Sequence, residues 1–360
     1  MSDAAEAKGA ITSAEEGARA AGKNPLPPDA FPDAAIVRGR LRNFGRPEAE
    51  LGAAFASGSA VAGPLLASGA LVATGPDAAS FLQGQLANQV QALTPGRVAR
   101  SLLLNHKGHA MADAMVLRDD AGRFRLVVDD GGLAVALRTL RDHLVFDQVE
   151  LSAMAETHLV TLQGDAAEHV LRTATANLAP ADDAHVAAQV AQAEVTVWRR
   201  RRAPSGGFDL LVPTGALVAV LNALRGGGAE LVGEDALDAA KVAGRLASAG
   251  GEAGEGVLPQ EAGLEDALSY RKGCYLGQEI MARIEARGNL RRALASVVLD
   301  GPPDPGTGAP EIRYGGKVVG RLGTVARMPD GSHRALAVLR TDLPSGAELE
   351  AGGRAARRVA

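Results

Sequence analysis

Hydrophobic and polar positions along the chain predict short strands mixed with helices from about residue 48 onward. A helix is expected from Pro76, because Phe81, Leu82, Leu86 and Val90 give it one apolar face. Hairpin-like spacing between the strands favours an α+β architecture over regularly alternating parallel strands and crossover helices. The same criteria predict further helices at 48–55, 132–144, 164–178, 214–224 and 235–246, and strands at 71–74, 111–117, 124–128, 145–151, 158–162, 195–198 and 208–212.

Both ends of the chain depart from this pattern. Residues 1–42 are rich in Ala, Gly and Pro, and we expect a disordered tail there. After Gly288 the chain changes to short strands and glycine turns, which predicts a small C-terminal β-barrel. The expected regions are the tail of residues 1–42, a first α+β domain of residues 43–151 plus about 240–290, a second α+β domain of residues 152–239, and a barrel of residues 291–360.

Composition narrows the class of protein. The net charge of −4 over 360 residues gives no global field that would recruit nucleic acid or an anionic membrane. No apolar run is long enough to span a bilayer, and the acidic N-terminus does not resemble a secretory signal. The single cysteine excludes an intrachain disulfide and fits a reducing compartment. We therefore expect a cytoplasmic protein without a membrane partner.

Residues 199–202 are four consecutive arginines at the end of a predicted strand. Strand side chains alternate between faces, and Trp198 is the one aromatic residue beside the run, so direct nucleic-acid binding is not expected. A solvated hairpin edge is the favoured interpretation.

The cysteine lies in residues 270–279, Tyr-Arg-Lys-Gly-Cys-Tyr-Leu-Gly-Gln-Glu. Apolar residues recur every fourth position from Leu276 to Ile284, so a helix should begin here with Cys274 at or just before its start. Unpaired backbone N–H groups and the basic residues Arg271 and Lys272 would then favour a thiolate. The alternative is a small buried hydrophobic side chain. No second cysteine or nearby histidine completes a ligand set, so no metal site is predicted.

The stretch 272–279 resembles the K-G-C-Y-x-G-Q-E signature of the YgfZ family, folate-binding relatives of the glycine-cleavage T-protein (aminomethyltransferase) that are implicated in iron–sulfur cluster assembly or repair. Residues 75–85 resemble the G-x-D-A-x-x-F-L-Q-G-Q opening of the same family. The resemblance covers roughly residues 43–350 and implies an aminomethyltransferase-like folate-binding fold with a C-terminal barrel. It implies a reactive centre at Cys274 and a surrounding motif of Lys272, Gly273, Tyr275, Gly277, Gln278 and Glu279.

The resemblance also implies tetrahydrofolate or a derivative as cofactor. In T-proteins an aspartate of a glycine-rich N-x-x-G-G-x-x-D-D stretch meets the reactive end of folate, and the corresponding loop here carries Asn105, Lys107 and Asp113. Because Asp113 is a single acid preceded by Ala112, the resemblance implies binding more than intact aminomethyl transfer. The 199–202 arginines are an alternative contact for a polyglutamate tail.

Two further candidates come from later stretches. Arg245 resembles the arginine of the family's R-x-x-x-G turn. T-proteins place a pterin-binding glutamate just after this arginine, whereas this chain has Ala247 and Ser248 there. Glu252 is a possible substitute for that glutamate. Glu261 lies in a stretch resembling the P-x-E-x-x-L lead into the cysteine motif.

Three functions remain open from the sequence. The first is a folate-binding protein that supports iron–sulfur proteins, or their assembly machinery, through Cys274. The alternative is a tetrahydrofolate-dependent aminomethyl- or methyltransferase of T-protein type. The third is a scaffold that binds partner proteins and holds folate as a structural group. Whether the chain is an enzyme is left open.

Overall fold

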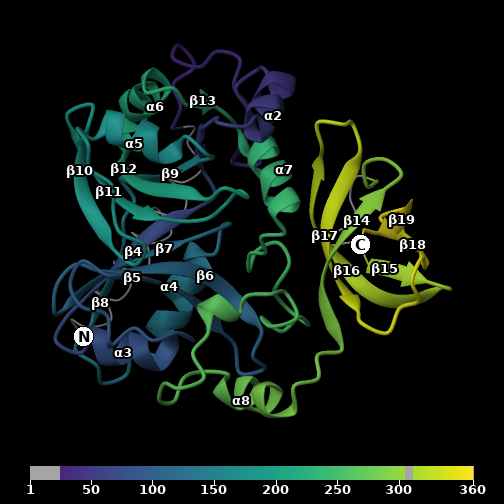
Figure 1. Cartoon of the computed structure of the whole chain (residues 1–360). Coiled ribbons are helices and arrows are strands. Elements are labelled where there is room, and N and C mark those ends of the chain that lie inside the picture. The colour runs from purple at the N-terminus through teal and green to yellow at the C-terminus, as the bar shows by residue number, and fades with distance from the viewer. Residues whose placement is uncertain (1–24, 305–310, 360) are drawn as a thin grey trace, which may run out of the picture.

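The computed structural model describes residues 25–304 and 311–359, which form two sheets, flanking helices and a barrel (Figure 1). The first sheet is antiparallel, in the order β5-β6-β7-β4-β8. Its apolar face packs against two helices around buried Phe81 and Phe124. Its elements are β4 (Gly69–Thr74), α3 (Ala78–Gln85), β5 (Val98–Leu104), β6 (Ala110–Arg118), β7 (Arg123–Val128), α4 (Leu133–Asp142) and β8 (Glu150–Ala153).

The second sheet has the order β10-β11-β12-β9-β3-β13, with the pair β3–β13 parallel and the other pairs antiparallel. Helices α5 and α6 cover its outer face, and Trp198, fully buried, packs in the cluster between the two sheets. Its elements are β3 (Val61–Leu65), β9 (Thr157–Gln163), α5 (Ala167–Ala174), β10 (His185–Val190), β11 (Ala193–Arg199), β12 (Gly207–Pro213), η1 (Thr214–Ala216), α6 (Leu217–Gly226) and β13 (Glu230–Leu231).

The segment before residue 43 is folded where the structure describes it, so the expected tail is wrong over residues 25–42. A hairpin of β1 (Ala35–Val37) and β2 (Arg40–Asn43) forms there, and Leu26 and Leu41 are buried in the core of the second sheet. Apolar side chains at these two positions anchor a segment that is otherwise rich in proline and glycine. Residues 1–24 lie outside the described residues.

Two helices and a connecting segment join the sheets to the barrel. Helix α2 (Pro47–Phe55) packs on α7 (Glu234–Gly244), and the buried Glu50 of α2 accepts the backbone N–H of Gly233 at 2.9 Å. The chain then passes through η2 (Glu265–Ala267) and α8 (Gln278–Arg287). Helix α7 packs on the barrel, so it lies between the sheets and the barrel (Figure 1).

The C-terminal strands close into the barrel that the sequence predicts, in the order β14-β17-β16-β15-β18-β19. Its interior is filled mostly by alanine, valine and leucine side chains. The strands are β14 (Arg292–Leu299), β15 (Glu311–Tyr314), β16 (Lys317–Arg327), β17 (His333–Arg340), β18 (Glu348–Ala351) and β19 (Arg354–Arg358).

Several local predictions differ from the structure. The helix expected to carry Leu86 and Val90 on its apolar face ends at Gln85, and Leu86 has an extended backbone. Strand β3 was not predicted, and it joins the second sheet although it precedes every strand of the first. The strand expected at 145–151 begins at Glu150, because Val145 and Phe146 are exposed in the preceding loop. Among the residues that the structure describes, no helix is long and apolar enough to cross a bilayer.

Candidate functional site

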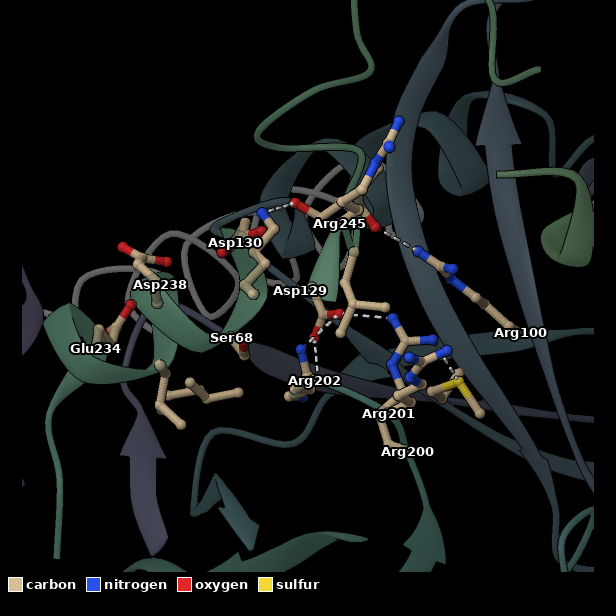
Figure 2. A pocket seen from close by; sticks show the side chains of 18 of the residues that line it. Ser68, Arg100, Asp129, Asp130, Arg200, Arg201, Arg202, Glu234, Asp238 and Arg245 are labelled. Atoms are coloured by element: carbon tan, nitrogen blue, oxygen red, sulfur yellow. Dashed lines mark hydrogen bonds and ion pairs between the residues drawn. The ribbon is translucent and has the colours of Figure 1, made fainter. Parts of the chain in front are cut away.

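A pocket of about 410 Å³ lies between the two sheets, helix α7 and the segment that follows α7 (Figure 2). Leu65, Met115, Leu237 and Leu246 supply its apolar walls. The polar lining residues come from β2, β5, the turn after β7, the arginine run and α7; they include Arg40, Arg100, Asp129, Asp130, Arg200, Arg201, Arg202, Glu234, Asp238, Lys241 and Arg245.

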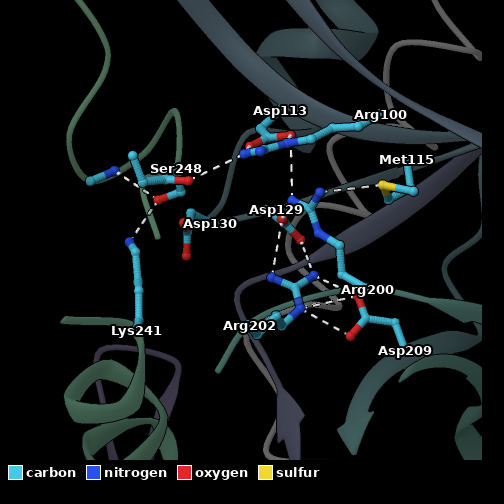
Figure 3. A network of polar contacts seen from close by, with 12 residues as sticks. Arg100, Asp113, Met115, Asp129, Asp130, Arg200, Arg202, Asp209, Lys241 and Ser248 are labelled. Carbon is cyan, nitrogen blue, oxygen red and sulfur yellow. Dashed lines mark hydrogen bonds and ion pairs between the residues drawn. The ribbon is translucent and has the colours of Figure 1, made fainter. Parts of the chain in front are cut away.

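One wall of the pocket is a network of three arginines and three aspartates (Figure 3). Arg100 contacts both carboxylate oxygens of Asp113, at 3.0 and 2.5 Å. Arg202 contacts Asp129 at 2.8 Å and Asp209 at 2.7 Å. Arg200 connects these two groups of ion pairs, because its guanidinium lies 3.2 Å from Asp129 and 3.6 Å from Asp113. The six side chains carry equal numbers of opposite charges, which is what allows them to be buried together.

The arginine run is therefore not the solvated edge that the sequence favoured. The side chains of Arg200 and Arg202 are 10% and 18% exposed, whereas Arg201 between them is exposed. This alternation follows from the extended backbone after β11, in which every second side chain faces the same side. The inward pair meets Asp209 of β12, seven residues after Arg202, and two aspartates that are distant in sequence, Asp113 of β6 and Asp129.

Asp113 lies behind the pocket lining. Burial alone would raise the pKa of this carboxyl group, but the charges of Arg100 and Arg200 outweigh burial and hold the pKa well below its usual range. Asp113 is therefore ionised at neutral pH, with both of its oxygens held by Arg100.

Of the other predicted folate residues, Arg245 lines the pocket. It ends α7 in the left-handed conformation (φ 53°), and its guanidinium donates to the carbonyl of Leu294 in β14 at 3.0 Å. Glu252, the possible substitute for the pterin-binding glutamate, is buried, and its carboxylate accepts the backbone N–H groups of Ser248 and Thr324 at 2.9 and 2.8 Å. That carboxylate also lies 3.1 Å from the ammonium of Lys241.

Asn105, Lys107 and Glu261 do not line this pocket. Asn105 and Lys107 lie in the loop between β5 and β6, where Lys107 is exposed. Glu261 is buried and accepts from both Nε and an NH2 nitrogen of Arg292, at 3.0 and 2.8 Å, which ties the lead into the cysteine motif to the first barrel strand. Folate contact by these three residues stays a prediction.

The cysteine motif lies apart from the pocket lining, at the end of the molecule near α8 (Figure 1). Cys274 is exposed, so the buried alternative is wrong. Helix α8 begins only at Gln278, after Gly277 in the left-handed conformation. Cys274 is therefore outside the first helical turn, and the expected effect of the helix dipole on its thiol does not apply, because that effect is confined to the terminal turn.

Lys272 holds the motif in place. Its buried ammonium donates to the backbone carbonyls of Gln83 (2.5 Å), Leu86 and Asn88 (3.1 Å) at the C-terminal end of α3, and it lies 4.8 Å from the ring centre of Tyr275. The two stretches that resemble one family thus touch, although 189 residues separate Gln83 from Lys272. The charge of Lys272 is committed to these carbonyls.

The β5–β6 loop packs directly on the same motif. A Cβ atom at Gly277 would lie 2.7 Å from the carbonyl oxygen of Asn105, and one at Gly108 would lie 2.7 Å from Cε of Met281. Both positions have positive φ, so glycine is required for the close approach and for the backbone conformation. Gln278 is half-buried and Glu279 is exposed. Within residues 25–304 and 311–359, no cluster of His, Cys, Asp or Glu has the arrangement of a metal site.

Three further charged residues that no sequence motif marks also line the pocket: Arg40, Glu234 and Asp238. Arg40 lies in the expected tail, and acidic residues in the first turn of a helix are ordinary partners of the helix dipole. No sequence signal distinguishes these three residues from surface charges.

Comparisons with known proteins agree with this architecture. The family model described as the GCVT N-terminal domain matches residues 67–272. An aminomethyltransferase of Symbiobacterium thermophilum is 29% identical over 270 residues, 71% of either chain. The tRNA-modifying protein YgfZ of Klebsiella pneumoniae is 29% identical over 223 residues, 61% of this chain and 66% of that one. The crystal structure of the glycine cleavage system aminomethyltransferase T from Bartonella henselae matches with a TM-score of 0.76 at 19% identity, covering 91% of this chain and 92% of that one.

Proposed function

Because this chain belongs to the GCVT N-terminal domain family, we propose that it is a YgfZ-like protein that binds a folate in its central pocket and supports iron–sulfur proteins through Cys274. Its aminomethyltransferase-like α+β fold places that pocket between two sheets and a helix. The pocket carries the folate part of the proposal, because its volume of about 410 Å³ and its mixed apolar and charged lining suit a flat ring system with a charged tail.

Two features of the pocket support a polar ligand. The Nε of Arg200 and the Oε1 of Glu234 are buried without a hydrogen-bond partner among the described residues, and a ligand would satisfy such groups. Arg201 and Arg245 are exposed lining residues whose charges suit the carboxylates of a glutamate tail. Tetrahydrofolate or a derivative meets both requirements, with its ring between Leu65 and Leu237.

The environment of Asp113 supports folate binding, rather than aminomethyl transfer, as the function. A general base needs a pKa near the working pH and a free path to the proton, whereas Asp113 is held ionised by Arg100 and does not line the pocket. The alternative, a tetrahydrofolate-dependent transferase of T-protein type, is supported by the similarity to the Symbiobacterium aminomethyltransferase. Turnover of a methylamine-type donor that survives Cys274→Ala would favour that alternative.

Cys274 supports the iron–sulfur part because its thiol is exposed on a segment that Lys272 and Gly277 hold in place. The exposed Gly273 beside it leaves room for a partner's backbone. Iron–sulfur proteins or their assembly machinery would reach the thiol without entering the central pocket. We place the protein in the cytoplasm, where a free thiol of this kind stays reduced.

Calorimetric titration with tetrahydrofolate tests the folate part. We expect micromolar-scale binding by the wild-type protein and a loss of about tenfold in Arg245→Asn, because one charge-assisted contact is removed and asparagine tolerates the left-handed backbone. Lys107→Ala compares the two candidate regions, since Lys107 lies outside the pocket lining. No binding, or an unchanged affinity in Arg245→Asn combined with a loss in Lys107→Ala, would contradict the central pocket.

A further inference from the structure

The first turns of α7 present two carboxyl groups, Glu234 and Asp238, to the central pocket. Residues four apart share one face of a helix, and Figure 2 shows both side chains on α7, across the view from Arg200 and Arg201. Asp235, the residue after Glu234, does not line the pocket and pairs with Arg42 instead.

Glu234 is buried, and one of its two carboxylate oxygens has no hydrogen-bond partner among the described residues. Its side chain is 3% exposed, and Oε2 accepts a hydrogen bond from Nε of Arg40 at 2.6 Å and lies 2.5 Å from Nη2 of the same guanidinium. Oε1 has no hydrogen-bond partner among the described residues. Asp238 likewise has neither a hydrogen bond nor an ion pair within the described part of the chain. Leaving the buried Oε1 of Glu234 without a donor is costly, and the half-buried Asp238 beside it is also unpaired, so N–H donors from a bound molecule would be favourable here.

The surroundings limit the kind of donor. Arg40 and Arg42 of the N-terminal hairpin and Lys241 of α7 face the pair with positive charge, and Asp130 is the neighbouring acid. These basic side chains balance the acids around the pair, so the site needs no cationic ligand and neutral N–H donors suit it. Leu65 and Leu237 line the pocket as well and suit a flat ring. The best match is therefore a neutral heterocycle with two adjacent N–H donors on one edge.

We propose that Glu234 and Asp238 bind the 2-amino-4-oxopyrimidine edge of a pterin, with Oε1 of Glu234 as one of the two acceptors. The inference rests on the proposed folate function and adds to it the orientation of the ligand. The pterin lies against α7, and the tail extends toward the exposed Arg201 and Arg245.

In this arrangement, binding of the pterin depends on the ionisation of Glu234. Burial raises the pKa of Glu234 to about 7, against the opposing pull of Arg40, and burial also raises the pKa of Asp238. Glu234 must be ionised to accept Arg40 at Oε2 and a pterin N–H at Oε1 together, so binding releases a proton when the pH is below about 7. Affinity for a neutral pterin should therefore rise about tenfold between pH 6 and pH 8.

The experiment compares pterin with lumazine, which has an oxygen in place of the 2-amino group, in titrations of the full chain at pH 7, where both rings are mainly neutral. The wild-type protein should bind pterin at least about tenfold more tightly than lumazine, because lumazine leaves an acceptor unpaired. Glu234→Gln and Asp238→Asn should each lose most of this preference and the pH dependence, while Asp235→Asn, on the same helix but outside the pocket, should retain both.

The outcomes separate this inference from the folate proposal. If tetrahydrofolate binds the wild-type protein but Glu234→Gln and Asp238→Asn keep the wild-type preference for pterin, the inference is wrong and the folate proposal stands. If neither tetrahydrofolate nor pterin binds the wild-type protein, both fail. Asp238→Asn provides an independent result should Glu234→Gln not fold, since Asp238 makes no hydrogen bond or ion pair within the described part of the chain.

Discussion

The cysteine motif and the central pocket place charged groups in opposite ways. In the motif, the buried ammonium of Lys272 donates its hydrogen bonds to backbone carbonyls, and the thiol of Cys274 is exposed. In the pocket, arginines and aspartates neutralise one another inside the protein, and the unused acceptors belong to α7. The difference indicates that the lysine of a motif visible in sequence can serve mainly to position a segment, while the carboxyl groups that face the pocket come from residues without a motif.

One residue joins the two regions. The carbonyl of Asn88 accepts from Lys272, and its side-chain amide donates to the carbonyls of Arg100 and Asp266, at 2.9 and 3.1 Å. Arg100 in turn pairs with Asp113 in the pocket wall. The motif and the pocket are therefore physically connected, and the comparison between them can be tested by substitutions on either side.

The largest effect is expected from Arg202→Met in the pocket wall. Removing this guanidinium leaves buried Asp129 and Asp209 without a main partner, which should lower the free energy of unfolding by about 3–5 kcal/mol. Denaturant unfolding would measure it. The neighbouring Arg201→Met is the matched control, because Arg201 is exposed and its loss should change stability by less than about 0.5 kcal/mol. Equal effects in the two variants would contradict the buried network.

A smaller loss is expected from Lys272→Met in the motif. The carbonyls of Gln83, Leu86 and Asn88 would lose a charged donor, at a cost of about 2 kcal/mol in the free energy of unfolding. Arg271→Met, one residue earlier and exposed, should be nearly neutral. If Lys272→Met is as stable as wild type, the lysine does not anchor the motif.

The smallest change in stability is expected from Cys274→Ala, because an exposed side chain contributes little to packing. Its unfolding midpoint and its affinity for tetrahydrofolate should match wild type, while the activity of iron–sulfur enzymes in cells that depend on this protein should fall. Unchanged iron–sulfur enzyme activity would remove the thiol from the proposed function and would favour the scaffold alternative.

Local patterns predicted most of the helices and the barrel, because apolar periodicity and glycine turns report directly on each element. The α+β class and the aminomethyltransferase-like fold are confirmed. Three features were mispredicted because each depends on contacts with residues distant in the sequence. The hairpin of β1 and β2 depends on Leu26 and Leu41 reaching the second core, and β3, which contains Pro64, depends on pairing with β9.

The arginine run failed as a prediction for the same reason. Two of the three aspartates that neutralise Arg200 and Arg202, Asp113 and Asp129, lie more than 70 residues earlier in the sequence, and nothing next to the arginines indicates them. Charged residues in a row are usually solvated, and a buried network is visible only when the strands have been placed. Glu234 was overlooked because an acidic residue in the first turn is ordinary in any helix, and Asp238 because a charged residue on a helix is usually solvated.

The interleaving of β3 has a consequence for how the chain is made. Because translation proceeds from the N-terminus, β3 emerges before any strand of the sheet that it joins and has no neighbour until β9 has followed. The carbonyl of Leu86 gains its side-chain donor even later, because Lys272 lies 186 residues downstream. A nascent chain that stops before Lys272 therefore leaves the end of α3 uncapped, and we expect such truncated products to be substrates for chaperones and proteases rather than stable folded fragments.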